Sequence, residues 1–279
     1  MKRAVIFGAS GTGKLLYPKI KMDFEVVYAT DNDPIYYGQV MWGGVQVKDK
    51  SALNNNDYDV VVIASVSGLD EIYTQLINEF RLDNSRIIRK YSELFVSAKF
   101  QFVESFAKIV YDKGILGSVA ECGVFRGEFA KEINRVFPDR ALYLFDTFEG
   151  FDERDMACEQ AGGYSNSEAN QFSITSEEIV LSKLPHRESV VVKKGYFPDT
   201  FDLADEKFCF VNLDTDLYKP ILAGLNKFWP LMTTGGAILV HDYFSALHRG
   251  VKAAVDEFSA IHGISFMPIG DYFSVAFVK

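Results

Sequence analysis

Cysteine is scarce in this chain. Its 279 residues include three cysteines, at widely spaced positions and without a CxxC pair. An odd, scattered set of this kind argues against a disulfide framework and against a cysteine-bound zinc ion. Cys122 and Cys209 lie inside or beside apolar segments typical of strands, where small buried thiols are common. The cysteines therefore indicate packing rather than redox or metal chemistry.

Long apolar runs and a surplus of basic residues are also missing. No apolar run approaches the roughly 18 residues of a membrane span. The first residues, MKRAVIFG, lack the apolar core and cleavage site of a secretory signal. Acidic residues outnumber basic ones by 38 to 29, and the net charge of −9 argues against nucleic acid as the main partner. A cytoplasmic enzyme without nucleic-acid or membrane partners is the default expectation.

Length and composition favour two globular domains. A hydrophobic content of 48% can fill a sizeable core, and the change in pattern near residue 92 predicts domains of residues 1–92 and 93–279. Apolar strand-like segments alternate with amphipathic helical ones, which is the pattern of α/β folds with parallel sheets. In the first domain, strands are predicted at 3–7, 25–29, 60–64 and 86–89, and helices at 14–21 and 69–80.

A glycine-rich turn, GASGTG at 8–13, follows the first predicted strand. It differs from a nucleoside-triphosphate loop because Leu15 follows Lys14, where that loop has a serine or threonine for magnesium. The exposed amides of such a turn can still hold a phosphate or carboxylate group, and Asp31 and Asp33 could meet sugar hydroxyls. Alternatively, the glycines only allow a tight turn, and the domain serves in docking or dimerisation.

The turn, the segment DNDP at 31–34 and the apolar, glycine-containing segment 37–47 resemble one known domain. It is the N-terminal domain of bacterial sugar O-acyltransferases that bind nucleotide sugars. The resemblance implies a small Rossmann-like domain with a nucleotide or phosphate ligand.

A helical pattern then covers residues 91–111 and predicts one long helix, or two in sequence, that joins the domains. Its aromatic side chains are predicted to pack against the second core rather than to bind a cofactor: Phe95, Phe100, Phe102, Phe106 and Tyr111.

The second half contains two strand-like segments that end in polar residues, VNLDTDLY at 211–218 and LVHDY at 239–243. A predicted helix at 219–230 and a predicted turn at 233–236 connect them, so that they form a parallel crossover unit. The carboxyl ends of neighbouring parallel strands meet at one edge of the sheet. Four side chains are therefore predicted to converge, and they could hold a hard divalent cation, act as acid and base, or do both: Asp214, Asp216, His241 and Asp242.

A second candidate site begins with the predicted strand SVAECGV at 118–124. Gly123 lets the backbone approach a ligand, and Gly127 opens a predicted helix whose amino-terminal end favours a carboxylate group. The next predicted strand, 141–145, ends at Asp146, where an acid can accept hydrogen bonds from both hydroxyls of a ribose. This arrangement indicates a nucleotide-type site.

Six ordered motifs make the second half similar to the sugar O-methyltransferases of the macrocin and mycinamicin type. They are SVAECGVFRG (118–127), LFDTFEG (144–150), KGYFPDTF (194–201), VNLDTDLY (211–218), HDY (241–243) and GVKAAVDEF (250–258). The resemblance extends over 91–279. It implies S-adenosylmethionine as methyl donor and a Rossmann-like class I methyltransferase sheet that ends in an antiparallel hairpin. Residues 264–267 and 273–277 suit that hairpin.

The same resemblance assigns the donor site. The residues implied at the donor-binding turn are Glu121, Gly123, Val124 and Gly127. Those implied around the ribose and adenine are Asp146, Thr147 and Phe148, and those implied to close over the adenosine are Gly195, Tyr196 and Phe197.

On the acceptor side, the resemblance implies Asp214 as metal ligand and candidate general base, and Asp242 as a second magnesium ligand. His241 departs from the family, which has an acid at this position. Imidazole is a softer ligand than magnesium prefers. Three roles stay open: His241 ligates the metal and favours manganese, it acts as the general base, or the metal has been lost.

The combined prediction is an α/β enzyme with a smaller Rossmann-like domain before the methyltransferase domain. It is expected to methylate a hydroxyl of a sugar or sugar-derived small molecule, including nucleotide- or phosphate-linked ones, in surface polysaccharide or secondary-metabolite biosynthesis. A homo-oligomer, in the simplest case a dimer, is expected. The alternative is a non-catalytic scaffold protein of a polysaccharide pathway with a decayed methyltransferase site.

Overall fold

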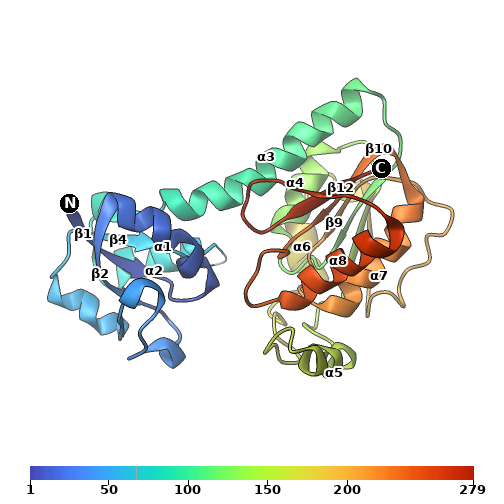
Figure 1. Cartoon of the computed structure of the whole chain (residues 1–279). Helices are drawn as coiled ribbons and strands as arrows, with labels where there is room; N and C mark the ends of the chain where they lie inside the picture. Colours follow the sequence, from blue (N-terminus) through green and yellow to red (C-terminus); the bar gives the residue numbers. More distant parts are fainter. Residues whose placement is uncertain (67) are drawn as a thin grey trace. The chain divides into compact units, whose positions relative to one another are not determined.

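A computed structural model describes residues 1–66 and 68–279, with side chains except those of 95–97. The chain divides into two compact units, Met1–Ser97 and Ala98–Lys279, which are described separately below (Figure 1). Within the described residues, none of the helices combines the length and the apolar character needed to span a bilayer.

Unit 1 contains a five-stranded parallel sheet in the order β3-β2-β1-β4-β5. Its strands are β1 (Lys2–Phe7), β2 (Phe24–Thr30), β3 (Val47–Lys48), β4 (Val60–Ile63) and β5 (Ile87–Ile88). Its helices are α1 (Gly11–Asp23) and α2 (Leu69–Asn78), with short 3-10 helices at η1 (Pro34–Tyr36), η2 (Trp42–Gly44), η3 (Lys50–Asn55) and η4 (Asn84–Arg86). Because every second residue of a strand faces the same side, Val5 and Phe7 pack against Ile72 and Leu76 of α2.

The helix α1 begins earlier than its apolar pattern predicts. Ser10 occupies the N-cap position in an extended conformation, and its side chain makes no capping hydrogen bond. The glycines that follow belong to its first turn. A Cβ atom at Gly13 would lie 2.1 Å from the carbonyl oxygen of Gly8, so only glycine fits there.

The boundary between the units falls within α3 (Lys90–Asp112), a single helix of 23 residues. In unit 1, the hydroxyl of Ser92 donates a hydrogen bond of 2.7 Å to the carbonyl of Ile63. In unit 2, Phe106 belongs to the core and Phe100 and Phe102 pack against it, as predicted, whereas Tyr111 is 40% exposed. The side chain of Phe95 lies outside the described residues.

Unit 2 contains a seven-stranded sheet in the order β11-β12-β10-β9-β6-β7-β8. Its strands are β6 (Ser118–Cys122), β7 (Leu142–Asp146), β8 (Val190–Lys194), β9 (Phe208–Leu213), β10 (Met232–Val240), β11 (Met267–Pro268) and β12 (Val275–Val278). The first five are parallel to one another, and β12 runs antiparallel to β10 and β11. The predicted terminal hairpin is therefore present.

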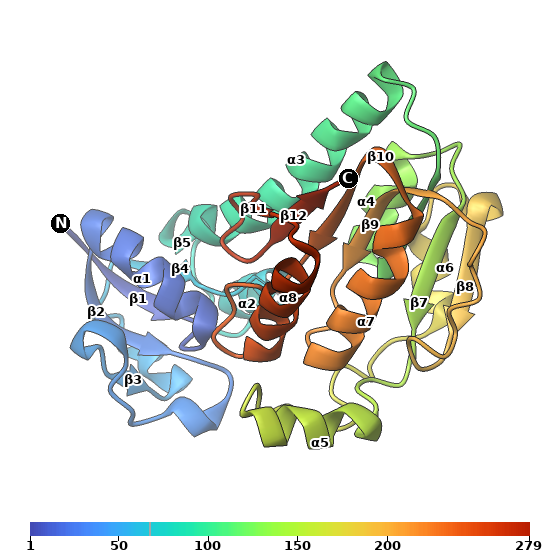
Figure 2. The ribbon, with the colours of Figure 1, turned by 45° about the vertical axis from the view of Figure 1, so that its right-hand side comes forward.

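Helices cover both faces of this sheet. They are α4 (Glu128–Val136), α5 (Glu153–Gly162), α6 (Glu177–Lys183), α7 (Tyr218–Phe228) and α8 (Arg249–His262), with 3-10 helices at η5 (Arg187–Ser189) and η6 (Trp229–Leu231). One core lies under α3, α4 and α6, and the other lies under α7 and α8, which run side by side (Figure 2). The result is a three-layer α/β/α unit.

The strand order places β6 between β9 and β7. The strands β7 and β8 lie on one side of β6, and β9 and β10 lie on the other, so the strand order reverses at β6. Ligands of open α/β sheets bind at the carboxyl edge beside such a switch point. Along this edge Cys122 pairs with Phe145 and with Leu213, and Leu213 pairs with Val240. The register therefore brings the residues that follow these strand ends to one level of the sheet.

The turn predicted at 233–236 is wrong. These residues lie inside β10, where the pairing with β9 shifts between Met232 and Ala237. Gly235 has a φ of 84°, which suits the extra residues of a bulge. The two glycines thus serve a bulge in a continuous strand. The helix α5 in the segment before α6 and the edge strand β8 were not predicted.

Candidate active site

The carboxyl ends of β9 and β10 bring the predicted acceptor residues together. Asp214 follows β9, and His241 and Asp242 follow β10; one possible ligand atom of each lies within 4.8 Å of the others. A second group with the same spacing combines Asp216, Asp242 and His248. Asp216 and Asp242 both have φ values near 60°, and this backbone conformation follows directly after their strands end.

A buried lysine, missed in the sequence, completes this cluster. Lys99 of α3 places its ammonium nitrogen 2.6 Å from Oδ2 of Asp214, and 4.3 Å from the centre of the Phe129 ring. The two side chains of this ion pair are 12% and 22% exposed. Lys99 precedes Val103 and Phe106 by four and seven residues, so it lies on the buried face of the helix.

The ion pair controls the protonation of both partners. Burial alone would lower the pKa of Lys99, but the Asp214 carboxylate raises it above the usual lysine value. Burial likewise would raise the pKa of Asp214, but the interactions with His241 and with the Lys99 ammonium group hold it below the usual range. Asp214 is therefore a carboxylate, and Lys99 is an ammonium group, across the physiological pH range.

The neighbouring acid Asp216 has a perturbed pKa. Burial, and then the charge and hydrogen bond of Asp242, raise the pKa of Asp216 well above the usual carboxyl range. Two carboxyl groups this close cannot both ionise easily, so Asp216 keeps its proton and donates it to Asp242 in a hydrogen bond.

These charges fit a hard divalent cation poorly. The Lys99 ammonium group already neutralises Asp214, and the Asp216–Asp242 pair retains a proton. His241 offers a nitrogen donor, which magnesium accepts less readily than oxygen.

The predicted donor site lies at the neighbouring strand ends. Glu121 is 2% exposed; its Oε1 accepts a hydrogen bond of 2.8 Å from the amide of Asn212, and burial raises its pKa to about 8. Among the described residues, its Oε2 has no hydrogen-bond partner. Because Gly123 has a φ of 81° and lies against the backbone of Asp214, it joins this site to the acceptor cluster.

Asp146 faces the turn after β6. Its Oδ2 accepts hydrogen bonds from the amides of Val124 (2.6 Å) and Phe125 (2.9 Å), and its Oδ1 accepts one from Phe148 (2.7 Å). The hydroxyl of the predicted residue Thr147 donates a hydrogen bond of 2.6 Å to the carbonyl of Gly150. The Asp146 carboxylate thus shapes the turn itself, with one lone pair directed at each amide.

Comparison with known proteins identifies the family. Residues 92–279 match the family model of macrocin-O-methyltransferase (TylF), and residues 1–88 match the model called C2185-like, N-terminal. The chain belongs to the macrocin-O-methyltransferase family.

Individual relatives agree with this assignment. The chain is 28% identical over 165 residues to mycinamicin III 3''-O-methyltransferase of Micromonospora griseorubida, covering 54% of this chain and 64% of the relative. It is 27% identical over 167 residues to 8-demethyl-8-(2,3-dimethoxy-alpha-L-rhamnosyl)-tetracenomycin-C 4'-O-methyltransferase of Streptomyces olivaceus, covering 54% and 61%. The chain therefore spans less than two thirds of the length of these relatives.

Solved structures share the fold. The O-methyltransferase NovP superimposes with a TM-score of 0.53 at 24% identity, covering 65% of this chain and 79% of NovP. CalS11, a calicheamicin methyltransferase, superimposes with a TM-score of 0.55 at 15% identity, covering 76% and 91%. The sheet of unit 2 is that of class I methyltransferases, as predicted.

Two further donor residues predicted from the macrocin-O-methyltransferase resemblance have partners within the protein. Phe197 is 6% exposed and packs between the rings of Phe145 and Phe228. The hydroxyl of Tyr196 donates a hydrogen bond of 2.8 Å to Asp155, and the Arg154 guanidinium group lies 3.6 Å from the centre of its ring. The Phe197 side chain therefore supports the sheet, and the segment presents its backbone and Tyr196 at the edge.

Gly127, the last residue predicted at the donor-binding turn, has a structural role in unit 2. It is the N-cap of α4, with a φ of 79°, and a Cβ atom there would lie 2.9 Å from a methyl group of Val180. Glycine is thus required where the first turn of α4 meets α6.

The glycine turn of unit 1 repeats the geometry of the donor turn. Oδ2 of Asp31 accepts a hydrogen bond of 2.7 Å from the amide of Ala9, as Asp146 does from Val124. Gly8 corresponds to Gly123, because a Cβ atom at Gly8 would lie 2.3 Å from the backbone carbonyl oxygen of Ala64. The Asp33 side chain caps η1 through the amide of Ile35.

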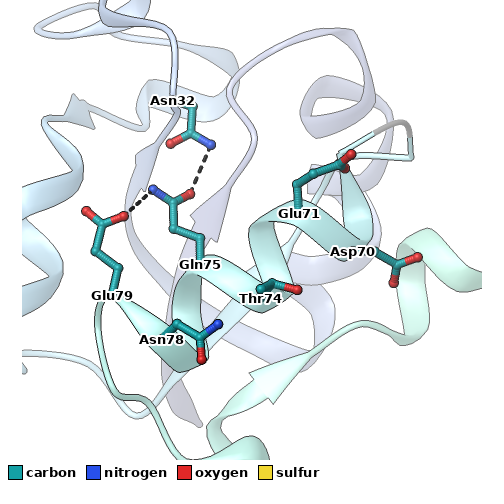
Figure 3. A pocket seen from close by; sticks show the side chains of 7 residues that line it. All are labelled: Asn32, Asp70, Glu71, Thr74, Gln75, Asn78 and Glu79. Atoms are coloured by element: carbon teal, nitrogen blue, oxygen red, sulfur yellow. Dashed lines mark hydrogen bonds between the residues drawn. The ribbon is translucent and has the colours of Figure 1, made fainter. Parts of the chain in front are cut away.

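An open depression on unit 1 is lined by none of the candidate residues Asp31, Asp33 and the glycine turn. Figure 3 shows that its lining comes from α2 and from Asn32, whose amide donates a hydrogen bond of 3.0 Å to Gln75. The remaining lining residues are Asp70, Glu71, Thr74, Asn78 and Glu79. Three carboxyl groups around this depression make it unfavourable for anions such as phosphate.

Proposed function

We propose that this protein transfers a methyl group from S-adenosylmethionine to a hydroxyl of a sugar or sugar-derived small molecule. The observation that carries the proposal is the contact at Gly123 between the predicted donor site and the predicted acceptor site. Gly123, in the predicted donor turn, lies against the backbone of Asp214. The family of the chain, macrocin-O-methyltransferase, supports the same reaction.

The donor half-site offers suitable partners for S-adenosylmethionine. Glu121 has a buried oxygen without a partner among the described residues, and the amino-terminal end of α4 favours a carboxylate group. Asp146 can turn toward ribose hydroxyls if the amides of Val124 and Phe125 are released. The donor supplies a methyl group already bound to a positive sulfur, so the residues have to orient it and exclude water.

The acceptor half-site has to remove a proton from a weakly acidic hydroxyl. We propose that the His241 imidazole takes this proton, while the Asp214 carboxylate orients the hydroxyl by accepting its hydrogen bond until transfer. The Lys99 ammonium group, 2.6 Å from Asp214, then offsets the negative charge that develops on the acceptor oxygen. The cation predicted from the family resemblance at Asp214, His241 and Asp242 is the competing proposal.

Methyl transfer is expected to continue after divalent cations are removed, because Lys99 supplies the positive charge. Labelled S-adenosylmethionine would be incubated with a panel of nucleotide sugars, phosphorylated sugars and glycosylated small molecules, with and without a chelator. Labelled product measures transfer. Activity that disappears with chelation and returns with Mg²⁺ or Mn²⁺ would instead support the cation site. If calorimetry shows no affinity for S-adenosylmethionine, the scaffold alternative is favoured.

The acceptor class rests on the relatives. The name of the Streptomyces olivaceus protein describes a substrate with a rhamnosyl group, and the name of the Micromonospora griseorubida protein specifies a 3''-O-methylation. For the present chain we propose, by analogy, a glycosylated acceptor made in polysaccharide or secondary-metabolite biosynthesis. A cytoplasmic location and a homo-oligomeric state, a dimer in the simplest case, complete the proposal.

We further propose that unit 1 binds a nucleotide or phosphate part of the acceptor at the turn before α1. The supporting observation is that this turn has the same geometry as the donor turn of unit 2. Asp31 and Asp33 are engaged by backbone amides, so the free amides at the start of α1 are the expected contact.

A charge placed at the N-cap tests this site in the full-length protein. Ser10→Asp is expected to weaken the binding of uridine diphosphate roughly tenfold, because a carboxylate at the helix start repels an anion. Ser10→Asn, an uncharged N-cap of similar size, is the matched control and should bind like the wild type. Isothermal titration calorimetry measures both. Equal affinities for all three proteins would remove this site from the proposal.

A further inference from the structure

His241 is held by a chain of hydrogen bonds outside the strand-end cluster. Its ring nitrogen Nδ1 lies 2.8 Å from the hydroxyl oxygen of Ser274, and that hydroxyl donates a hydrogen bond of 2.5 Å to Oδ2 of Asp271. The direct distance from Nδ1 to Oδ2 of Asp271 is 3.9 Å, so the serine hydroxyl bridges the two groups.

The far end of this chain is rigid and buried. Asp271 is 1% exposed, and Ser274 is fully buried. The other oxygen of Asp271 accepts hydrogen bonds from the amides of Phe273 (2.9 Å) and Ser274 (2.6 Å). The carboxylate is therefore fixed by the backbone just before β12, and β12 pairs with β10 directly beside His241, at Val240 and Val275.

The direction of the hydrogen bonds follows from the chemistry of the groups. The Ser274 hydroxyl has a single proton and donates it to Oδ2 of Asp271. The serine oxygen then faces His241 with lone pairs, and Nδ1 has to carry a hydrogen to bond with it. In a neutral imidazole this leaves the lone pair on Nε2.

The remaining ring nitrogen faces the reactive side. Nε2 of His241 lies 4.0 Å from Oδ1 of Asp242, and one ring nitrogen of His241 lies within 4.8 Å of a carboxylate oxygen of Asp214. We propose that Asp271 and Ser274 are positioning residues that hold His241 as the Nδ1–H tautomer, with its Nε2 lone pair directed at the acceptor site. The catalytic meaning of this arrangement rests on the proposed methyl transfer; the tautomer itself does not.

The tautomer can be read without any assay of activity. The protein would be labelled with ¹⁵N-histidine, which gives signals from four residues, and the His241 signals would be identified by their loss in His241→Gln. Spectra would be recorded at a pH high enough that the chemical shifts of the ring nitrogens no longer change with pH, so that the ring is neutral. The expected result is a protonated Nδ1 and an unprotonated Nε2. A wild-type His241 that carries its hydrogen on Nε2 overturns the proposal.

Asp271→Asn is the sharpest variant, because it should reverse the chain. The asparagine oxygen is needed by the two backbone amides, so its NH₂ group faces Ser274 and donates to it. The serine hydroxyl is then free to donate to Nδ1, and the hydrogen moves to Nε2. An unchanged tautomer in a folded Asp271→Asn protein contradicts the proposal.

Ser274→Ala tests the same chain if the asparagine variant does not fold. It should give a mixture of both tautomers, whereas Ser259→Ala, which removes a serine hydroxyl that donates to Ile264, should leave the His241 signals unchanged. A folded Ser274→Ala protein that keeps the wild-type tautomer alone would show that the serine plays no part. Under the proposed function, Asp271→Asn also lowers kcat about 10²-fold or more with little change in the affinity for S-adenosylmethionine. The expected spectra without methyl transfer in the wild type would leave the tautomer assignment intact and refute the proposed function.

Discussion

Gly123→Ala is expected to leave little folded protein. A Cβ atom at this position would lie 2.1 Å from the carbonyl oxygen of Asp214 and 2.6 Å from its carbonyl carbon, and both are backbone atoms. They cannot move away, because the amide of Asp214 is bound to the carbonyl of Cys122 at 2.8 Å between two paired strands. The φ of 81° is also unfavourable for alanine. Together these effects should cost roughly 4 kcal/mol or more, a large share of the stability of an ordinary domain.

Gly163→Ala is the matched control for the backbone conformation. Gly163 ends α5 with a φ of 59°, and nothing lies within 4 Å of a Cβ atom built there. This variant should lose only about 1 kcal/mol, the cost of the left-handed conformation alone. Denaturant unfolding compares the two proteins. Equal losses of stability would show that the close approach of β6 and β9 does not restrict position 123.

The elements around Gly123 were predictable because each strand is a short apolar run that ends at a polar residue or a glycine. Parallel strands place those ends at one edge, so the convergence of Asp214 with His241 and Asp242 follows from the pattern and from general rules of sheet topology. The register, which pairs Leu213 with Cys122 and with Val240, then sets the level at which the residues meet.

Lys99 could not be placed in the same way. Its partner Asp214 lies 115 residues further along the chain, and no local pattern connects a helix of one segment to a strand end of another. The position of Lys99 in the helix does give an indication, because Lys99 lies on the same face as the buried residues Val103 and Phe106. A lysine on a buried helix face requires a partner with negative charge, and the strand-end acids are the natural candidates.

Other misses have local causes. The glycines before Ala237 suggest a turn by their chemistry, but the neighbouring strand β9 continues the pairing and converts them into a bulge. Phe197 was assigned to the donor site by resemblance alone, whereas its ring is taken up by Phe145 and Phe228. A family motif thus identifies a segment of the site, and it leaves open which of its side chains serve the core.

Asp214→Asn is expected to reduce methyl transfer about 10²- to 10⁴-fold, since the carboxylate that orients the acceptor hydroxyl is lost. The same change leaves Lys99 buried without a charged partner, which should cost roughly 3–5 kcal/mol of stability. A loss of activity in this variant alone would therefore have two explanations, loss of the orienting carboxylate and partial unfolding.

The double variant Lys99→Met/Asp214→Asn separates them. Methionine fills the space of the lysine stem against Phe129 and removes the unpaired charge, so that most of the lost stability should return. Activity should stay as low as in Asp214→Asn, because neither the carboxylate nor the positive charge beside it is restored. Denaturant unfolding and single-turnover methyl transfer measure the two effects side by side. A double variant that regains both stability and activity would show that Asp214 serves only to neutralise Lys99 and does not orient the acceptor hydroxyl.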